Sequence, residues 1–241
     1  SWAYDAVGRA VLSVFGNPDS EVERYAITYQ EDGSATTVGP TLQSVNHSFE
    51  ISHGVARFGT VSDVCIACDR DVASITYDQH GNPDIVTDHR GNASDYDYSP
   101  DNLLLTLTHA VGASESYSIQ NEWDQTLRQP VRTVSPDRET TYTYNARGQV
   151  LSRTETDLLD GENRSWTYVY FEDPGQPERL GKKQSIDGPR TDVQDVTLFE
   201  YYPADDPEGR FRAGDLKAII NPLGHRTEYL EYDADGRLTK V

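Results

Sequence analysis

The sequence has few of the residues from which thick cores and redox or metal sites are built. Its 241 residues include no methionine, two cysteines and three tryptophans, and only 36% are apolar. The mean hydropathy is −0.68. With so little apolar surface to bury, one large all-β domain or two small ones would have a thin core. The 15 tyrosines suit a sheet one layer deep, because their rings bury area while their hydroxyls stay hydrogen-bonded.

Other absences exclude classes of function. No apolar run approaches the roughly 20 residues of a membrane helix, and no segment resembles a signal peptide, so we expect no membrane insertion. Forty acidic residues against 21 basic ones give a net charge of −19, which repels phosphate and argues against nucleic acid as a partner. No hydrolase, zinc-protease, Walker or dinucleotide-binding motif occurs. We therefore expect no catalytic residue, resident metal or cofactor.

What the chain does contain is a repeated turn motif, Tyr-Asp followed by glycine three residues after the aspartate. Aspartate suits the first position of a tight turn because its carboxylate caps backbone amides. Glycine suits the fourth position, where a positive φ is often required. Each such tetrad is therefore predicted to close a β-hairpin. The predicted turn and strand-end residues are Tyr4, Asp5 and Gly8; Tyr77, Asp78 and Gly81; Asp88 and Gly91; Tyr144 and Gly148; and Tyr232, Asp233 and Gly236.

Between the tetrads, β-branched and aromatic residues alternate with a period of two, as in residues 141–144, 166–170 and 196–201. Such alternation indicates strands. Turn signals recur along the whole chain, and no helical period lasts beyond two turns. The predicted fold is all-β, a repetitive antiparallel hairpin meander that forms a curved ribbon, with almost no helix.

One array is predicted over residues 1–241. Strand-end aromatic residues mark its copies, except for a double gap between Tyr29 and Tyr77, where a degenerate repeat is expected at about 45–70. Polar insertions at about 157–164 and 203–212 are expected to protrude as loops. Because the chain begins without methionine and ends directly after a motif, we expect it to be a piece of a longer array. The markers are Tyr4, Tyr29, Tyr77, Tyr98, Trp123, Tyr144, Tyr170, Tyr202 and Tyr232.

These motifs resemble the RHS, or YD-repeat, family. The resemblance runs along the whole chain, in segments such as Trp2 to Ala10, Thr76 to Asn82, Asp187 to Val193 and Asn221 to His225. It implies a hairpin ribbon that spirals into a hollow shell, of which roughly nine or ten units of about 25 residues would form an open, curved part. Bacterial polymorphic toxins and insecticidal toxin complexes use such shells to enclose a C-terminal toxic domain, and related animal arrays serve at cell surfaces.

The function implied by this resemblance is structural and non-enzymatic. The implied partner is the rest of a parent chain, including an enclosed toxin domain, and the implied location is outside the cell or at its surface, reached by the type VI apparatus or another export route. The alternative is an adhesion or carbohydrate-binding module, whose glycans would stack on outward-facing rings. Sheet cores use aromatic ladders too. The rings concerned are Trp123, Trp166, Tyr168, Tyr170, Tyr201 and Tyr202.

Three local patterns have competing interpretations. Cys65 and Cys68 form a CxxC that is consistent with a disulfide, with a free thiol pair, or with zinc if His47 and His53 supply further ligands. Residues 205–210 resemble the family's self-cleavage motif but carry Arg210 where leucine is expected, so we interpret them as an acidic hairpin loop. A cluster of carboxylates could supply oxygen ligands to calcium, but we interpret these residues as solvated turn caps. They are Asp84, Asp88, Asp95, Asp97 and Asp101.

Overall fold

The structure, a computed structural model, describes residues 1–17, 20–52, 54–62 and 72–241. All the secondary-structure elements assigned among these residues are β-strands. The chain divides into two compact units, Ser1–Gln120 and Asn121–Val241. The predicted all-β hairpin meander is confirmed. The CxxC of Cys65 and Cys68, together with His53, lies outside the described residues.

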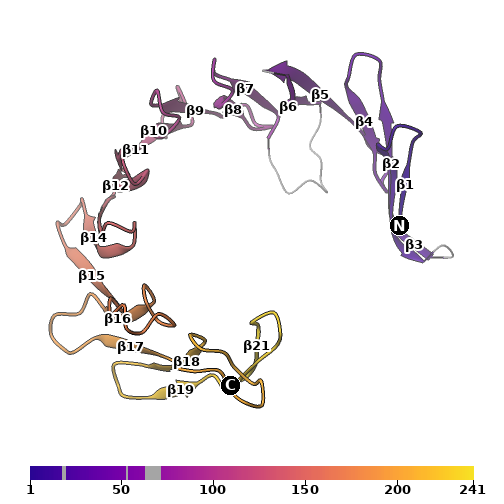
Figure 1. Cartoon of the computed structure of the whole chain (residues 1–241). Coiled ribbons are helices and arrows are strands. Elements are labelled where there is room, and N and C mark those ends of the chain that lie inside the picture. Colours follow the sequence, from indigo (N-terminus) through magenta and orange to yellow (C-terminus); the bar gives the residue numbers. More distant parts are fainter. Residues whose placement is uncertain (18–19, 53, 63–71) are drawn as a thin grey trace. The chain divides into compact units, whose positions relative to one another are not determined.

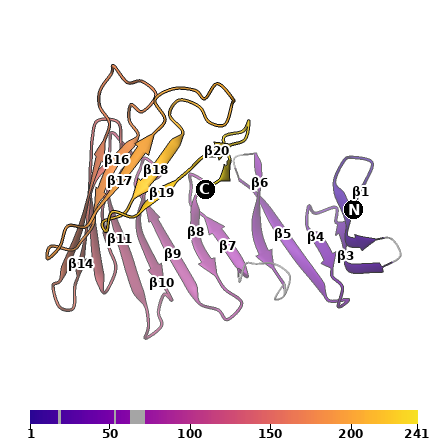
Figure 2. The ribbon, with the colours of Figure 1, turned by 90° about the horizontal axis from the view of Figure 1, so that it is seen from below.

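In the first unit each strand pairs antiparallel with the one that follows it in the sequence, as Figures 1 and 2 show. The double gap between Tyr29 and Tyr77 contains a hairpin without a Tyr-Asp pair, in which Phe49 pairs with Phe58. The strands are β1 (Trp2–Tyr4), β2 (Ala10–Asn17), β3 (Ser20–Tyr29), β4 (Ala35–Val38), β5 (Ser44–Ser52), β6 (Val55–Val61), β7 (Ser74–Tyr77), β8 (Pro83–Thr87), β9 (Ala93–Tyr98), β10 (Leu104–His109) and the start of β11 (Tyr117–Asp124).

The second unit repeats this pattern. From β12 to β19 each strand again pairs antiparallel with the next, and β20 pairs with β21 in a small separate sheet. Its strands are the end of β11, β12 (Gln129–Val134), β13 (Arg138–Tyr144), β14 (Val150–Asp157), β15 (Asn163–Tyr170), β16 (Lys183–Asp187), β17 (Val196–Tyr201), β18 (Leu216–Ile220), β19 (Arg226–Glu228), β20 (Glu231–Tyr232) and β21 (Leu238–Lys240).

The core is thin, as the composition predicts. Small and medium side chains account for most of the buried apolar set, and large rings are mostly half-buried because a single sheet covers each ring from the sides. In β15 the burial alternates, with Trp166, Tyr168 and Tyr170 half-buried between exposed Thr167 and Val169. The buried apolar residues are Val14, Ala35, Val45, Leu103, Tyr202 and Ala218.

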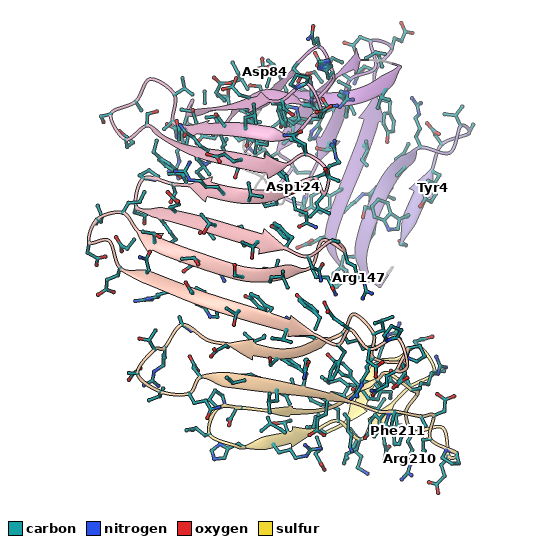
Figure 3. The ribbon with its side chains drawn as sticks, turned by 60° about the vertical axis from the view of Figure 1, so that its left-hand side comes forward. Tyr4, Asp84, Asp124, Arg147, Arg210 and Phe211 are labelled. Atoms are coloured by element: carbon teal, nitrogen blue, oxygen red, sulfur yellow. The ribbon has the colours of Figure 1, made fainter. Side chains whose placement is uncertain are left out.

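Strand direction places the Tyr-Asp turns of each unit along one edge of its sheet. Because antiparallel neighbours reverse direction, every second turn falls on the same edge. In the second unit Asp124, Arg147 and Phe211 lie along that edge (Figure 3). We call this edge, which carries the strand-end tyrosines, the tyrosine edge. The five-residue connection Leu158–Glu162, within the insertion expected at 157–164, lies at the opposite edge.

Candidate functional site

Each Tyr-Asp turn is held by the same set of hydrogen bonds. In the turn that begins at Asp78, the Asp78 amide donates to the carbonyl of Asn82, and the Gly81 amide donates back to the carbonyl of Asp78. The Asp78 carboxylate accepts the amides of His80 and Asn82, both at 2.8 Å. A hydrogen bond from the Asn82 side chain lowers the pKa of this carboxyl. The fourth position has a positive φ, which glycine adopts without strain.

The same backbone pattern recurs where the sequence predicts turns. Asp5, Asp88, Asn145 and Asp233 each accept amides from the residues two and four positions later. Asn221 does the same at the opposite edge of the second unit. The glycines at the fourth position are Gly8, Gly81, Gly91, Gly148 and Gly236, with φ between 75° and 88°.

Several strand-end tyrosines close strand pairs that no turn joins at the tyrosine edge. Strands β12 and β13, for example, are joined at the opposite edge. At the tyrosine edge the Tyr144 hydroxyl donates to the carbonyl of Pro130 at 2.6 Å. Tyr170 ties β15 to the Val150 carbonyl of β14 in the same way, at 3.1 Å. From β12 to β18, neighbouring strands are therefore held at this edge alternately by a covalent connection and by a tyrosine hydroxyl. We call this bond the tyrosine lock.

In the part of the chain that the structure describes, six tyrosine locks join residues 14 to 20 positions apart. At five of the six tyrosines concerned, and at Tyr4, the ladder shifts register between the tyrosine and the paired residue before it. Such a bulge bends the strand and re-aims the side chain. The sequence pattern predicts Tyr202 as the strand-end aromatic residue of its repeat. That prediction is wrong, because Tyr201 ends β17 and forms the lock. The donors are Tyr29, Tyr77, Tyr144, Tyr170, Tyr201 and Tyr232, with acceptor carbonyls on Ala10, Phe58, Pro130, Val150, Lys183 and Leu216.

Side chains also link one turn of the tyrosine edge to the next. In the first unit Arg57 donates to the Gly81 carbonyl at 2.5 Å. In the second unit the Gln149 side chain donates to the carbonyl of Gly181 at 2.6 Å. Lys182 in turn donates to the Gly214 carbonyl. Each repeat therefore binds its neighbour through the backbone of a turn, which is the nearest-neighbour coupling expected of a repeat protein.

Cationic side chains cover three of the six aromatic rings on which the alternative function would stack a sugar. The Arg153 guanidinium lies 4.8 Å from the Trp166 ring centre, and the Lys183 ammonium lies 5.3 Å from that of Tyr168. Lys182 covers Tyr201 at 5.3 Å. A pyranose ring would have to displace these cations, each held by a cation–π attraction of about 0.5–2 kcal/mol. The geometry therefore does not favour carbohydrate binding on these rings.

The insertion at 203–212 folds back on the sheet at Tyr202 and Asp206. The rings of Tyr202 and Phe211 stack with their centres 3.5 Å apart and their planes within 6°. Tyr202 donates its hydroxyl to the Tyr229 carbonyl at 2.9 Å. The Asp206 side chain is only 4% exposed and holds Arg210 by two guanidinium bonds, at 2.8 and 3.0 Å, and one amide bond. Arg210, which departs from the self-cleavage motif, is therefore the partner that orders this turn.

The Asp206–Arg210 pair should make stability depend on pH in the acid range. Hydrogen bonds from Arg210 lower the pKa of Asp206 to about 2. A depressed pKa contributes stability above the unfolded-state value near 3.9 and loses it as the pH falls toward 2. We expect the stability difference between wild type and Asp206→Asn to be constant above about pH 5 and to fall steadily toward pH 2, where most of it is lost. Chemical denaturation between pH 6 and pH 2 measures it.

The control for this pH dependence is Glu208→Gln in the same turn. The Glu208 side chain is 74% exposed and lies 3.5 Å from Arg210. The Glu208→Gln variant should lose stability between pH 6 and pH 2 nearly as wild type does, because an exposed ion pair contributes little. A pH-independent difference between wild type and Asp206→Asn would contradict the role assigned to the pair.

The remaining candidate ligands are not brought together. Within residues 1–17, 20–52, 54–62 and 72–241, no group of three or more His, Cys, Asp or Glu side chains could hold a metal ion. The carboxylates proposed for calcium thus do not converge, and Asp88 serves as a turn cap. His47 bonds to Thr37 at 3.0 Å, and burial lowers its pKa. The described residues also contain no helix with the length and apolar character needed to cross a membrane.

Comparisons with known proteins agree with this architecture. A family model described as the RHS repeat matches residues 212–241, which contain β18 to β21 and the Tyr232–Gly236 motif. The crystal structure of TcdB2-TccC3 superposes with a TM-score of 0.58 at 13% identity, over 98% of this chain and 15% of that one. Residues 212–241 are therefore an RHS repeat. No curated protein matches the sequence.

Two further crystal structures show the same likeness to this chain. TcdB2-TccC3-Cdc42 matches with a TM-score of 0.57 at 14% identity, over 98% of this chain and 15% of that one. TcdB2-TccC3 without its hypervariable C-terminal region matches with a TM-score of 0.50 at 11% identity, over 99% and 15%. At such identities the likeness concerns the fold. The RHS-repeat chain spans about 15% of the length of these chains.

Proposed function

We propose that this RHS-repeat chain is part of the wall of a shell that encloses and protects a toxin domain carried at the C-terminus of the same parent protein. The observation that supports the proposal best is the alternating closure of the tyrosine edge by turns and tyrosine locks. This closure stabilises a sheet one layer deep that has few buried side chains. A wall of this kind can surround a volume much larger than the volume that its own residues fill.

The role proposed is confinement without chemistry. The fold likeness to chains about seven times longer supports a larger parent protein. One of the matched crystal structures is that of TcdB2-TccC3 without its hypervariable C-terminal region. The enclosed domain, export from the cell and a location outside it or at its surface are parts of the proposal.

The experiment is limited proteolysis of the purified parent protein. If the wall encloses a C-terminal domain, that domain should resist a protease that digests it when it is expressed alone. Gly148→Val should abolish part of this protection, because valine is strained at a φ of 75° and the hairpin β13–β14 would open. Equal digestion of the enclosed and the free domain would overturn the proposal.

A matched control lies in the same turn. Ala146 is exposed and occupies a position where φ is not positive, so Ala146→Val adds the same β-branched side chain without the strain. Protection of the C-terminal domain should be unchanged in Ala146→Val. Loss of protection in both variants would show that the protease acts on the turn itself and not through an opened wall.

A further inference from the structure

A cavity lies at the edge of the first unit opposite to the tyrosine edge, between two connections of different length. One wall is the turn of residues 88–92, which joins β8 to β9. The other wall is the longer connection of residues 110–116, which joins β10 to β11. The cavity has a volume of about 360 Å³, within the range of small-ligand pockets. Its polar lining comes from Asp88, Asn92, Ser94, His109 and Glu115.

Hydrogen bonds between the two walls hold the cavity in shape. The Val111 amide donates to the carbonyl of Ala93 at 2.9 Å, which ties the long connection to the start of β9. The Ser94 hydroxyl lies 3.3 Å from Nδ1 of His109. The Ser116 hydroxyl donates to the carbonyl of His109 at 3.1 Å. The imidazole of His109 is therefore fixed between both walls.

One residue of the lining is in a strained backbone conformation. Ala110 has a φ of 50°, in the left-handed region that residues other than glycine, asparagine and aspartate seldom adopt. Strain of this kind is found most often at binding and catalytic sites, where the surrounding structure maintains it. The strained position carries a methyl group that forms part of the cavity wall.

Two carboxylates bring negative charge to the cavity. The Asn92 side chain donates to Asp88 at 2.8 Å, and the Ser114 hydroxyl donates to Glu115. These bonds lower the pKa of both carboxyls, so both are ionised at neutral pH. Arg90 is exposed on the same turn and also lowers the pKa of Asp88. Among the residues that the structure describes, no lysine or arginine lines the cavity.

Other aspartate turns of the chain show which group fits beside such a carboxylate. In three of them arginine stands four residues after the aspartate, and its guanidinium faces the carboxylate. The pairs are Asp5 and Arg9 at 2.7 Å, Asp206 and Arg210 at 2.8 Å, and Asp233 and Arg237 at 3.9 Å. Asp88 has Asn92 at this position. A carboxylate of the kind that this chain elsewhere pairs with a guanidinium therefore adjoins a cavity that can admit one.

We propose that this cavity binds an organic cation, whose ammonium or guanidinium group lies against Asp88 and Glu115 and whose apolar part lies against Val86 and Ala110. Carboxylates accept charge-assisted hydrogen bonds, which are stronger than neutral ones. The net charge of −19 attracts cations to the chain. The cation is either a free polyamine or a lysine or arginine side chain of a polypeptide. This site goes beyond the enclosure of a toxin domain, which does not depend on it.

Titration of the 241-residue chain with agmatine, which carries both cationic groups, tests the proposal. At low ionic strength the backbone amide signals of Ser94 and Ala110 in NMR spectra should shift and reach saturation. Asn92→Arg should weaken this binding by about 10-fold or more, because it places the chain's own guanidinium beside Asp88. Arginine at this turn position is native to the chain, so the variant should fold.

The matched control is Asn82→Arg, which makes the same change at the equivalent position of the turn that begins at Asp78. Asn82 caps that turn as Asn92 caps its own, and it does not line the cavity. Agmatine should bind this variant within about 2-fold of wild type, because the added charge is distant and screened.

A capped peptide with a single arginine, Ala-Ala-Arg-Ala-Ala, distinguishes the two sources of the cation. Tighter binding of agmatine identifies a free cation, and tighter binding of the peptide identifies a basic side chain. Three results would overturn the proposal. They are the absence of a saturable shift with either probe, equal affinity for the uncharged analogue N-butylurea, and equal loss of binding in Asn92→Arg and Asn82→Arg. The last would mean that agmatine is attracted only by the overall charge.

Discussion

Replacing Gly81 with valine is expected to lower the free energy of unfolding more than the same replacement at Gly236. Both glycines hold the fourth turn position, with φ of +83° and +79°, where another residue is strained by about 1–3 kcal/mol. A Cβ at Gly236 would meet nothing within 4 Å, whereas one at Gly81 would lie 2.5 Å from Nη2 of Arg57. Displacing Arg57 loses its bond to the Gly81 carbonyl and about 1.5–3 kcal/mol more.

Asparagine is the matched control because the chain already uses it at this turn position. Asn102 has a φ of 59° in a turn with the same backbone bonds. Gly236→Asn should therefore cost only a few tenths of a kcal/mol, as asparagine tolerates positive φ. Gly81→Asn should still displace Arg57 and remain costly. Urea denaturation of the four variants measures these differences, and equal losses for valine at the two sites would contradict the role of Arg57.

Replacing Tyr202 with alanine should cost about 3–5 kcal/mol, the range for removing a buried aromatic ring. Tyr202 is 9% exposed and is the largest of the buried apolar residues. The change would remove the stack with Phe211, which holds the insertion at 203–212 against the sheet. We therefore expect lower stability in chemical denaturation and faster proteolytic cleavage within residues 203–212.

The control is Tyr202→Phe, which keeps the ring. It loses only the hydroxyl bond to the Tyr229 carbonyl, for about 0.5–1.5 kcal/mol, and should leave the insertion resistant to protease. If alanine proved no more costly than phenylalanine, the stack with Phe211 would contribute nothing to the fold.

Much of the fold follows from short-range patterns. The turn that begins at Asp78 is specified within five residues, because its cap, its backbone bonds and its positive φ all lie between Asp78 and Asn82. The alternation in 166–170 likewise predicts which side chains of β15 share a face. Patterns of this range could not show what residues 203–212 do. Their packing depends on Phe211 meeting a ring nine positions earlier, across a turn.

The sequence by itself determined that this protein is an antiparallel meander of hairpins, because turns and strand alternation are encoded within a few residues of each other. Only the tertiary structure decided how neighbouring hairpins are joined. In each tyrosine lock the hydroxyl meets a carbonyl 14 to 20 residues away. The same structure placed Tyr201, not Tyr202, in a lock and brought Arg57 against Gly81. These contacts depend on strand register and on bulges, which are set by the pairing of whole strands and which no local pattern records.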